Sequence, residues 1–262
     1  MNYLIEGLQG SGKSTLVRKV SEKRPSYKVI TEGEYSPIEL AWCAYMDEGR
    51  YREVLDRYQL LKKEIEEKTF SEGDKKIVCY TKIMTDDHSF YQDLEKNEIY
   101  NGRISDEQFR SIVLGRYSAW NGNDTVFECS LLQNTVEDMI LFKCKSDEEI
   151  LDFYRQVREA LEGKDYRILY LKAEDLKGNL DVIRKERSDD AGNELWFPMM
   201  MGFFNNCPFA KKNNVSGEEA LLSHLAHRME LELRICREIF PDRTTVLVSK
   251  KYTDEDVDRA LI

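Results

Sequence analysis

The sequence predicts an α/β protein in which helices cover a mainly parallel sheet. Short runs rich in β-branched and aromatic residues alternate with segments of helical periodicity, the pattern of repeated strand–helix units. The runs are almost continuously hydrophobic, as in strands that are buried on both faces. They are Tyr3–Glu6, Tyr27–Thr31, Thr125–Cys129, Arg167–Leu171 and Thr245–Val248. One of them runs directly into a glycine-rich loop and a helix.

The segments between these runs carry start and stop signals of helices. A helix is predicted over Lys13–Lys23, where apolar residues recur on one face. Ser146 opens a capping box, and the apolar stripe that follows it ends at Gly163. A longer stripe runs from residue 218 to residue 240 and stops before Pro241.

Other segments are less regular. Ser36 followed by Pro37 is typical of a helix start, so a long helical region is predicted from there to about Lys68. Residues 76–84 are a candidate extra or edge strand. Two segments, 74–124 and 188–217, exceed ordinary loop lengths and are interpreted as inserts in a single domain over residues 1–262.

Composition excludes several function classes. The 262 residues include 39 Lys and Arg against 49 Asp and Glu, a net charge of −10 that disfavours nucleic-acid binding. No apolar stretch approaches the roughly 20 residues that cross a bilayer, and no charged leader with an apolar segment opens the chain. None of the six cysteines falls in a C-x-x-C pair. We therefore expect a cytoplasmic protein without a membrane or nucleic-acid partner.

The loop from Gly7 to Thr15 matches G-x-x-x-x-G-K-[ST] between a predicted strand and a predicted helix. Glycines allow backbone N–H groups to surround a phosphate, and the helix N-terminus favours the same anion. Lys13 is expected to project into a solvent cleft and reach the β- and γ-phosphates of ATP, while Ser14 holds Mg²⁺. A loop that binds nothing is disfavoured because every fixed position is filled. The predicted nucleotide-binding residues are Gly7, Gly10, Ser11, Gly12, Lys13, Ser14 and Thr15.

Two further observations separate an enzyme from a nucleotide switch. The sequence has neither the Asn-Lys-x-Asp motif of GTPases nor the paired Asp-Glu strand end of motor ATPases. The central strand ends instead in Glu128, which would face Mg²⁺ and the acceptor, or would serve only as a salt-bridged loop carboxylate. Arg184 and Arg187 lie on a predicted helix and would neutralise phosphoryl charge, or would form a solvated basic face.

These motifs resemble those of the nucleoside and nucleotide kinase group of P-loop proteins, which includes deoxynucleoside kinases and thymidylate kinase. The resemblance implies a three-layer α/β/α P-loop fold with a five-stranded sheet in the order 2-3-1-4-5. It also implies a carboxylate after the second strand that removes the acceptor's proton; Glu32 and Glu34 are the candidates, and Glu32 is preferred. Where the group has Glu-Arg-Ser, this chain has Glu128-Cys129-Ser130, which argues against ordinary deoxynucleoside specificity.

The sequence thus predicts an ATP- and Mg²⁺-dependent kinase that acts on a small hydroxyl- or phosphate-bearing acceptor. Aromatic residues of the inserts could stack on a planar ring, which favours a nucleoside-like acceptor, or could form a satellite hydrophobic cluster. Lys82 or Arg116 could bind an acceptor phosphate, although Cys129 favours a neutral hydroxyl. The alternative is an ATP-binding switch or slow ATPase whose inserts recognise a protein; a homodimer is one assembly left open. The predicted catalytic residues are Lys13, Glu32, Glu128, Arg184 and Arg187, with Ser14 and Glu128 as metal ligands.

Overall fold

The computed structural model of the chain describes residues 1–189 and 191–262. The chain divides into two compact units. The first, here called the sheet unit, consists of Met1–Val29 and Asn121–Ile262, and the second, the inserted unit, is Ile30–Trp120. The prediction of a single domain over residues 1–262 stays a prediction.

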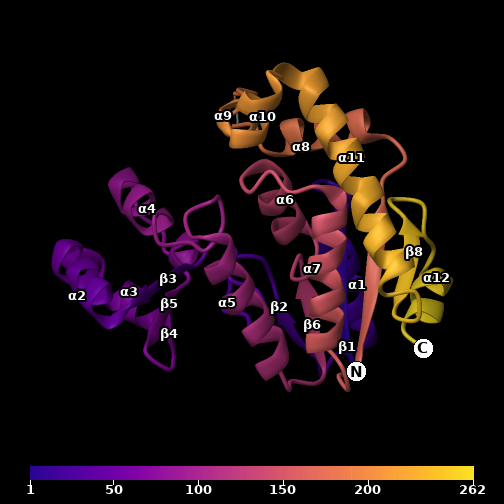
Figure 1. Cartoon of the computed structure of the whole chain (residues 1–262), viewed down its shortest axis with the longest axis horizontal. Helices are drawn as coiled ribbons and strands as arrows, with labels where there is room; N and C mark the ends of the chain where they lie inside the picture. Colours follow the sequence, from indigo (N-terminus) through magenta and orange to yellow (C-terminus); the bar gives the residue numbers. More distant parts are fainter. Residues whose placement is uncertain (190) are drawn as a thin grey trace. The chain divides into compact units, whose positions relative to one another are not determined.

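The sheet unit is built on a five-stranded sheet with the order β2-β6-β1-β7-β8 (Figure 1). Strand β1 pairs in parallel with β6 and β7, and β7 pairs in parallel with β8. This confirms the predicted α/β class and the order 2-3-1-4-5 of the sheet strands. The strands are β1 (Asn2–Gly7), β2 (Lys28–Ile30), β6 (Thr125–Glu128), β7 (Tyr166–Lys172) and β8 (Thr244–Val248).

The predicted helices of the sheet unit are present. Helix α1 spans Lys13–Lys23, as expected, and the capping box at Ser146 starts α7 with both reciprocal hydrogen bonds formed. The long C-terminal stripe is α11, which begins at Gly217 and ends at Glu238. The other helices are α6 (Gln133–Leu141), α7 (Asp147–Ala160), α8 (Leu176–Glu186), α9 (Trp196–Asn206), α10 (Pro208–Asn213) and α12 (Asp254–Ala260).

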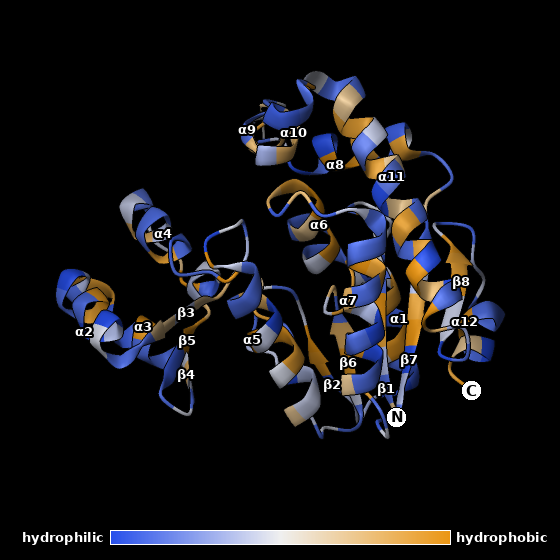
Figure 2. Ribbon diagram, viewed as in Figure 1, coloured by the Kyte–Doolittle hydropathy of each residue, from blue (hydrophilic) through white to orange (hydrophobic). Residues whose placement is uncertain are grey.

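One hydrophobic cluster of the sheet unit joins the sheet to α1 and to the C-terminal helix α12. Ile5 and Leu169 of the strands and Leu16 and Val20 of α1 are fully buried in one cluster. Burial of each such side chain contributes about 1.5–3 kcal/mol. Figure 2 shows the strands as largely hydrophobic, whereas α7 carries many hydrophilic residues. This packing fixes the ends of β1 and β6, from which the candidate site is built.

The inserted unit contains a three-stranded antiparallel sheet with the order β3-β5-β4. Its core gathers buried residues of the strands and helices, among them Met46, Val54, Tyr80 and Phe90. The strands are β3 (Ala44–Asp47), β4 (Thr69–Glu72) and β5 (Lys75–Val78). The helices are α2 (Glu48–Arg57), α3 (Lys62–Glu67), α4 (His88–Glu95) and α5 (Asp106–Ala119), with short 3₁₀ turns at Gln59–Leu61 and Tyr80–Lys82.

The helix predicted from Ser36 is wrong in its first part. The Ser36 hydroxyl accepts hydrogen bonds from the N–H groups of Ile38 and Glu39, but the chain forms only a local turn there. It then enters β3, because pairing with β5 outweighs the local helix signal, which suits a turn equally well. The strand predicted over 76–84 is confirmed only for its first residues, since β5 ends at Val78.

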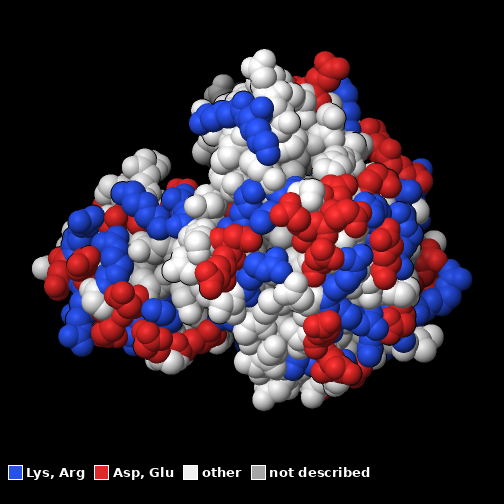
Figure 3. Space-filling view, viewed as in Figure 1, with Lys and Arg blue, Asp and Glu red and all other residues white. Residues whose placement is uncertain are grey.

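Charges of both signs are interspersed over the face drawn in Figure 3. None of the helices in residues 1–189 and 191–262 is long and apolar enough to cross a bilayer. All six cysteines are free thiols, and five of them are buried.

Candidate active site

The phosphate loop joins β1 to α1, and its shape depends on glycine. Gly12 has a φ of 88° and forms the N-cap of α1, with no side chain capping the helix. A Cβ atom placed on Gly12 would meet nothing within 4 Å, so the space in front of the helix N-terminus is open. The first N–H groups of α1 and the positive end of the helix dipole therefore face a cradle of the kind that binds phosphate.

Gly10 is required for a different reason. A Cβ atom on Gly10 would lie 2.6 Å from Cδ1 of Ile183 and 3.0 Å from the carbonyl oxygen of Asn179. Helix α8 therefore packs directly on the phosphate loop. Leu180 and Ile183 of this helix are buried. The backbone of the loop is thus supported from the side of α8.

Lys13 does not project into a solvent cleft, and that expectation is wrong. Its side chain folds back over the loop and is only 7% exposed. The ammonium group donates hydrogen bonds to the carbonyl oxygens of Gly7 (2.9 Å) and Leu8 (2.8 Å) and to Oε1 of Gln133 (2.8 Å). A buried ammonium must satisfy its three donors, and the two loop carbonyls and Gln133 do so.

Ser14 and Glu128, the two predicted metal ligands, are brought together. The exposed hydroxyl of Ser14 donates a 2.7 Å hydrogen bond to Oε1 of Glu128, which ends β6. A hydroxyl and a carboxylate are oxygen ligands of the type that Mg²⁺ prefers. Among the described residues, no group of three or more His, Cys, Asp and Glu side chains could hold a metal. The donor pair fits Mg²⁺ in particular, since this ion commonly completes its shell with water and phosphate oxygens.

A buried ionic network that was not predicted from the sequence contacts the phosphate loop through Gln9. Arg228 of α11 is fully buried and donates a 2.7 Å hydrogen bond to Oε1 of Gln9, within the phosphate loop. It forms ion pairs with Glu137 and, at 3.2 Å, with Glu232. Burial acts to raise the pKa of Glu137, but Arg228 and His224 outweigh it and lower that pKa to about 2. The signal was the spacing: residues 224, 228 and 232 share the inward face of a helix that is otherwise apolar there.

Glu6 ties β1 to the start of α6. Its buried carboxylate accepts hydrogen bonds from the N–H groups of Leu131 (2.7 Å), Leu132 (3.1 Å) and Gln133 (3.3 Å). Burial raises the pKa of Glu6 to about 7, against the lowering effect of these N–H groups, and Glu232 adds a like charge. The same contact places Gln133 where it accepts from Lys13.

Arg184 and Arg187, which were predicted to neutralise phosphoryl charge, contact residues of the segment that follows α8. The Arg184 guanidinium forms two hydrogen bonds with Glu194, of 2.9 and 3.0 Å, and one of 3.0 Å with Glu218. Its centre lies 3.9 Å from the ring centroid of Phe197, and that of Arg187 lies 5.0 Å from the ring of Trp196. An open, charged hollow of about 640 Å³ lies beside them, lined by Asp181, Arg184, Lys185, Ser188, Asp189, Gly192 and Glu194.

The two candidate bases lie in the inserted unit and differ in their surroundings. Glu34 closes a local turn, in which its carboxylate accepts from the N–H (2.7 Å) and hydroxyl (2.8 Å) of Thr31. Oε1 of Glu32 accepts a 3.0 Å hydrogen bond from the indole of Trp42, a side chain that is 47% exposed. Glu32 as the base stays a prediction, and an exposed indole is one of its partners.

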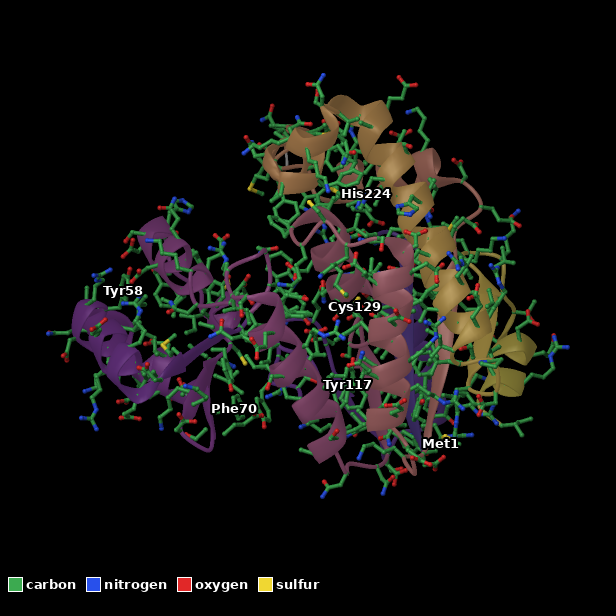
Figure 4. All side chains as sticks on the ribbon, viewed as in Figure 1. Met1, Tyr58, Phe70, Tyr117, Cys129 and His224 are labelled. Carbon is green, nitrogen blue, oxygen red and sulfur yellow. The ribbon has the colours of Figure 1, made fainter. Side chains whose placement is uncertain are left out.

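Several side chains proposed to contact the acceptor have internal partners. Arg116 is buried, forms an ion pair with Glu72 and donates to the carbonyl oxygen of Ser36. In the second insert, the ring of Phe204 packs against His224 with centroids 5.7 Å apart. Cys129 is buried at the end of β6 with a φ of 57° (Figure 4). Arg116 is thus held by an ion pair and a hydrogen bond, and Phe204 by packing against His224.

No family model matches the chain, and no curated protein matches it. The strand order β2-β6-β1-β7-β8, with the phosphate loop between β1 and α1, is that of a P-loop kinase-like fold. Among solved structures it is similar to deoxyadenosine kinase from M. mycoides with bound dATP, with 15% identity over 100% of this chain and 97% of that chain and a TM-score of 0.39. The strand order, the phosphate loop and the contact between Ser14 and Glu128 are therefore the observations that bear on function.

Proposed function

We propose that the protein is an ATP- and Mg²⁺-dependent phosphotransferase of the cytoplasm that acts on a small acceptor, nucleoside-like by preference. The observation that carries the proposal is the hydrogen bond of 2.7 Å between Ser14 and Glu128, beside the N-terminus of α1. It joins a hydroxyl of the phosphate loop to a carboxylate of the neighbouring strand. This pair is suited to bind a magnesium ion that is also coordinated by nucleotide phosphates.

In this proposal the loop binds the nucleotide through backbone N–H groups and the helix dipole. Lys13 exchanges its bonds to the carbonyl oxygens of Gly7 and Leu8 for phosphate oxygens. Since phosphate bears full negative charge, the charge-assisted bonds formed are stronger than those released. Bound MgATP supplies the phosphoryl group and neutralises part of its charge, while Ser14 and Glu128 orient the metal.

Arg184 and Arg187 are proposed to stabilise the transferred phosphoryl group. Arg184 must first leave Glu194 and Glu218, and both carboxylates are more than a third exposed. Exposed ion pairs contribute only about 0.2–1 kcal/mol each, so phosphate can displace them. Glu32 is proposed as the base that accepts the acceptor's proton, on the strength of its place after β2 and of the resemblance to nucleoside kinases.

A neutral hydroxyl is the preferred acceptor group. A phosphate-bearing acceptor would need fixed cations, and Arg116 is already paired with Glu72. Cys129, where nucleoside kinases have arginine, supplies no positive charge. Lys82, which is exposed, is the remaining cation proposed for that role.

The test is ADP formation from ATP and Mg²⁺ with a panel of nucleosides, nucleoside monophosphates, aminoglycosides and ring-free sugars. We expect turnover that depends on a nucleoside-like acceptor. Turnover independent of any acceptor would favour the slow ATPase or switch instead, and phosphorylation of ring-free sugars alone would contradict the preference for a planar ring.

A further inference from the structure

Two buried thiols face each other in the inserted unit. Sγ of Cys43 lies 3.7 Å from Sγ of Cys79, and the residues are 0% and 2% exposed. Cys43 precedes β3 and Cys79 follows β5, two antiparallel strands in which Ala44 is opposite Val78. One further step of this register places the cysteines opposite each other. Antiparallel neighbours have Cα atoms about 4.5–5.5 Å apart, within the roughly 4.4–6.8 Å that a disulfide spans.

The two sulfurs are chemically unequal. The hydrogen bond from the Cys43 thiol lowers the pKa of Cys79, an effect that burial opposes and that Lys68 and Lys82 reinforce. The same hydrogen bond, together with burial, raises the pKa of Cys43. The thiolate is the nucleophilic form of cysteine, so Cys79 is the sulfur that reacts first.

Cys43 also contacts the loop that carries the candidate bases. Its sulfur lies 3.8 Å from the carbonyl oxygen of Gly33 and 3.9 Å from that of Glu34. The preceding residue, Trp42, donates its indole N–H to Glu32. A Cβ atom on Gly33 would lie 2.9 Å from the hydroxyl of Thr81, so the loop is closely packed here. Cys43 is therefore linked through one peptide bond to the residue whose indole contacts Glu32.

We propose that Cys43 and Cys79 form a reversible disulfide that acts as a redox switch on the Glu32 loop. A disulfide bond is about 2.05 Å long, so the sulfurs must approach each other by more than 1 Å from their 3.7 Å separation. Cys43 then withdraws from the carbonyl groups of Gly33 and Glu34, and the contact between Trp42 and Glu32 changes.

The oxidant is a small peroxide, because both thiols are buried. The Cys79 thiolate attacks one oxygen of hydrogen peroxide, which breaks the O–O bond, forms a sulfenic acid and, with one proton, releases water. The Cys43 sulfur then attacks the sulfenic sulfur, and the S–O bond breaks as the second water leaves with the Cys43 proton. Two thiols are oxidised by two electrons in total, and one peroxide is reduced to two waters. A dithiol reductant reverses the reaction.

The covalent step is tested on the folded full-length protein. After treatment with hydrogen peroxide, denaturation and alkylation, we expect two of the six thiols to be protected, with a peptide that links Cys43 to Cys79. Dithiothreitol should restore all six. Cys43→Ser and Cys79→Ser should form no such link, and the other four cysteines serve as internal controls. An intact protein in which all six thiols stay alkylatable, or in which other cysteines pair, would overturn the proposal.

Two measurements test whether the disulfide alters the Glu32 loop: tryptophan emission and the acceptor-dependent rate. In the double variant Trp120→Phe, Trp196→Phe, Trp42 is the single remaining tryptophan. Oxidation of this variant should change the tryptophan emission, and the additional substitution Cys79→Ser should abolish the change. Oxidation should also lower the acceptor-dependent rate several-fold without weakening nucleotide binding, a readout that rests on the proposed function. If the reduced protein has no acceptor-dependent rate, the proposed function fails. The emission of Trp42 then tests by itself whether the disulfide alters the Glu32 loop. A disulfide that changes neither the emission nor an existing rate would refute the switch.

Discussion

The two units hold their candidate functional groups by different means. In the sheet unit, the phosphate loop, the N-terminus of α1 and the end of β6 set positions through the backbone, and Ser14 meets Glu128 as a consequence. In the inserted unit, Glu32 is held by the side chain of Trp42, and Cys43 lies against Cys79. The shape of the phosphate loop follows from a short local motif, whereas the contacts of Ser14 with Glu128 and of Cys43 with Cys79 depend on segments that are distant in the sequence. We therefore expect the sheet unit to lose function through charge removal and the inserted unit through rearrangement.

The largest effect is expected for Lys13→Met, which removes the ammonium group but keeps the length and the apolar stem. Loss of a charge that binds the phosphoryl group should lower turnover by about 10²–10³-fold or more. Lys13 also makes three internal hydrogen bonds, so a loss of stability of about 1–3 kcal/mol should accompany it. Kinetics and urea unfolding measure the two effects.

Lys19→Met, on the same helix but with an exposed ion pair to Asp254, is the matched control and should alter neither quantity appreciably. Nucleotide affinity and turnover of Lys13→Met equal to those of the wild type would show that the loop does not act through this lysine.

Arg228→Met tests whether the ionic network beneath the loop supports the nucleotide site. Breaking a buried ion pair leaves uncompensated charge on Glu137 and Glu232 and typically costs about 3–5 kcal/mol of stability. Release of Gln9 should also raise KM for ATP, measured at a temperature where the variant is folded.

Arg234→Met, on the same helix with exposed partners, should cost less than about 1 kcal/mol and leave KM unchanged. A destabilised Arg228→Met protein with an unaltered KM would reduce the network to a purely structural feature of the sheet unit.

Arg184→Ala should have a moderate effect, with kcat reduced by about tenfold and KM little altered. Arg184 is proposed to contact the phosphoryl group only after it has left Glu194 and Glu218, so its contribution belongs to the transition state. Lys177→Ala, on the same helix, provides the control. An increase in KM alone would place Arg184 in ground-state binding.

The smallest effect concerns pH. Burial raises the pKa of Glu6 from its ordinary value of 4.5 to about 7 in the folded protein, so between these values the folded state binds more protons than the unfolded state. Stability from this group is therefore fully present below pH 4.5 and is lost as pH rises toward 7. Glu6→Gln should flatten the decline of Tm across that window; an identical pH profile would contradict the assignment.

Glu39 and Glu98 of the inserted unit, whose pKa values burial also raises to about 7, should show the same behaviour in their own Gln variants. Each accepts a tyrosine hydroxyl, from Tyr100 at 2.6 Å and from Tyr80 at 2.7 Å. Buried carboxyls are thus common to the two units, and the pH response should not separate them.

What could be predicted from the sequence follows the same division. The strands, α1 and the capping box at Ser146 have sequence signals that lie within a few residues of each other, and these predictions were confirmed. The first part of the helical region predicted from Ser36 was wrong because β3 pairs with β5, about thirty residues further along the chain, whereas α2 and α3 occupy its later part. The contact between Cys43 and Cys79 was missed for the same reason.

Within the candidate site, the motif predicted the position of the loop between β1 and α1 but not the partners of its side chains. Lys13 was expected in solvent, because a sequence pattern does not show that Gln133 supplies an acceptor. Arg228 was missed because the helical spacing places it on the inward face but does not show which residues neutralise its charge. Its partners Glu137 and Gln9 lie far away in the sequence.

The most direct test of the account is the Mg²⁺ dependence of acceptor-dependent ADP formation in wild type and Glu128→Gln. Glutamine keeps the shape of the side chain and can still accept from Ser14, but it removes the charge that binds the metal. We predict a rate about 10²-fold lower, typical of a lost electrostatic contact, with a higher Mg²⁺ requirement and little change in nucleotide affinity. Glu174→Gln, an exposed carboxylate paired with Lys251, is the control. A Glu128→Gln protein with the wild-type rate and Mg²⁺ response would contradict the assignment of Ser14 and Glu128 as the metal site.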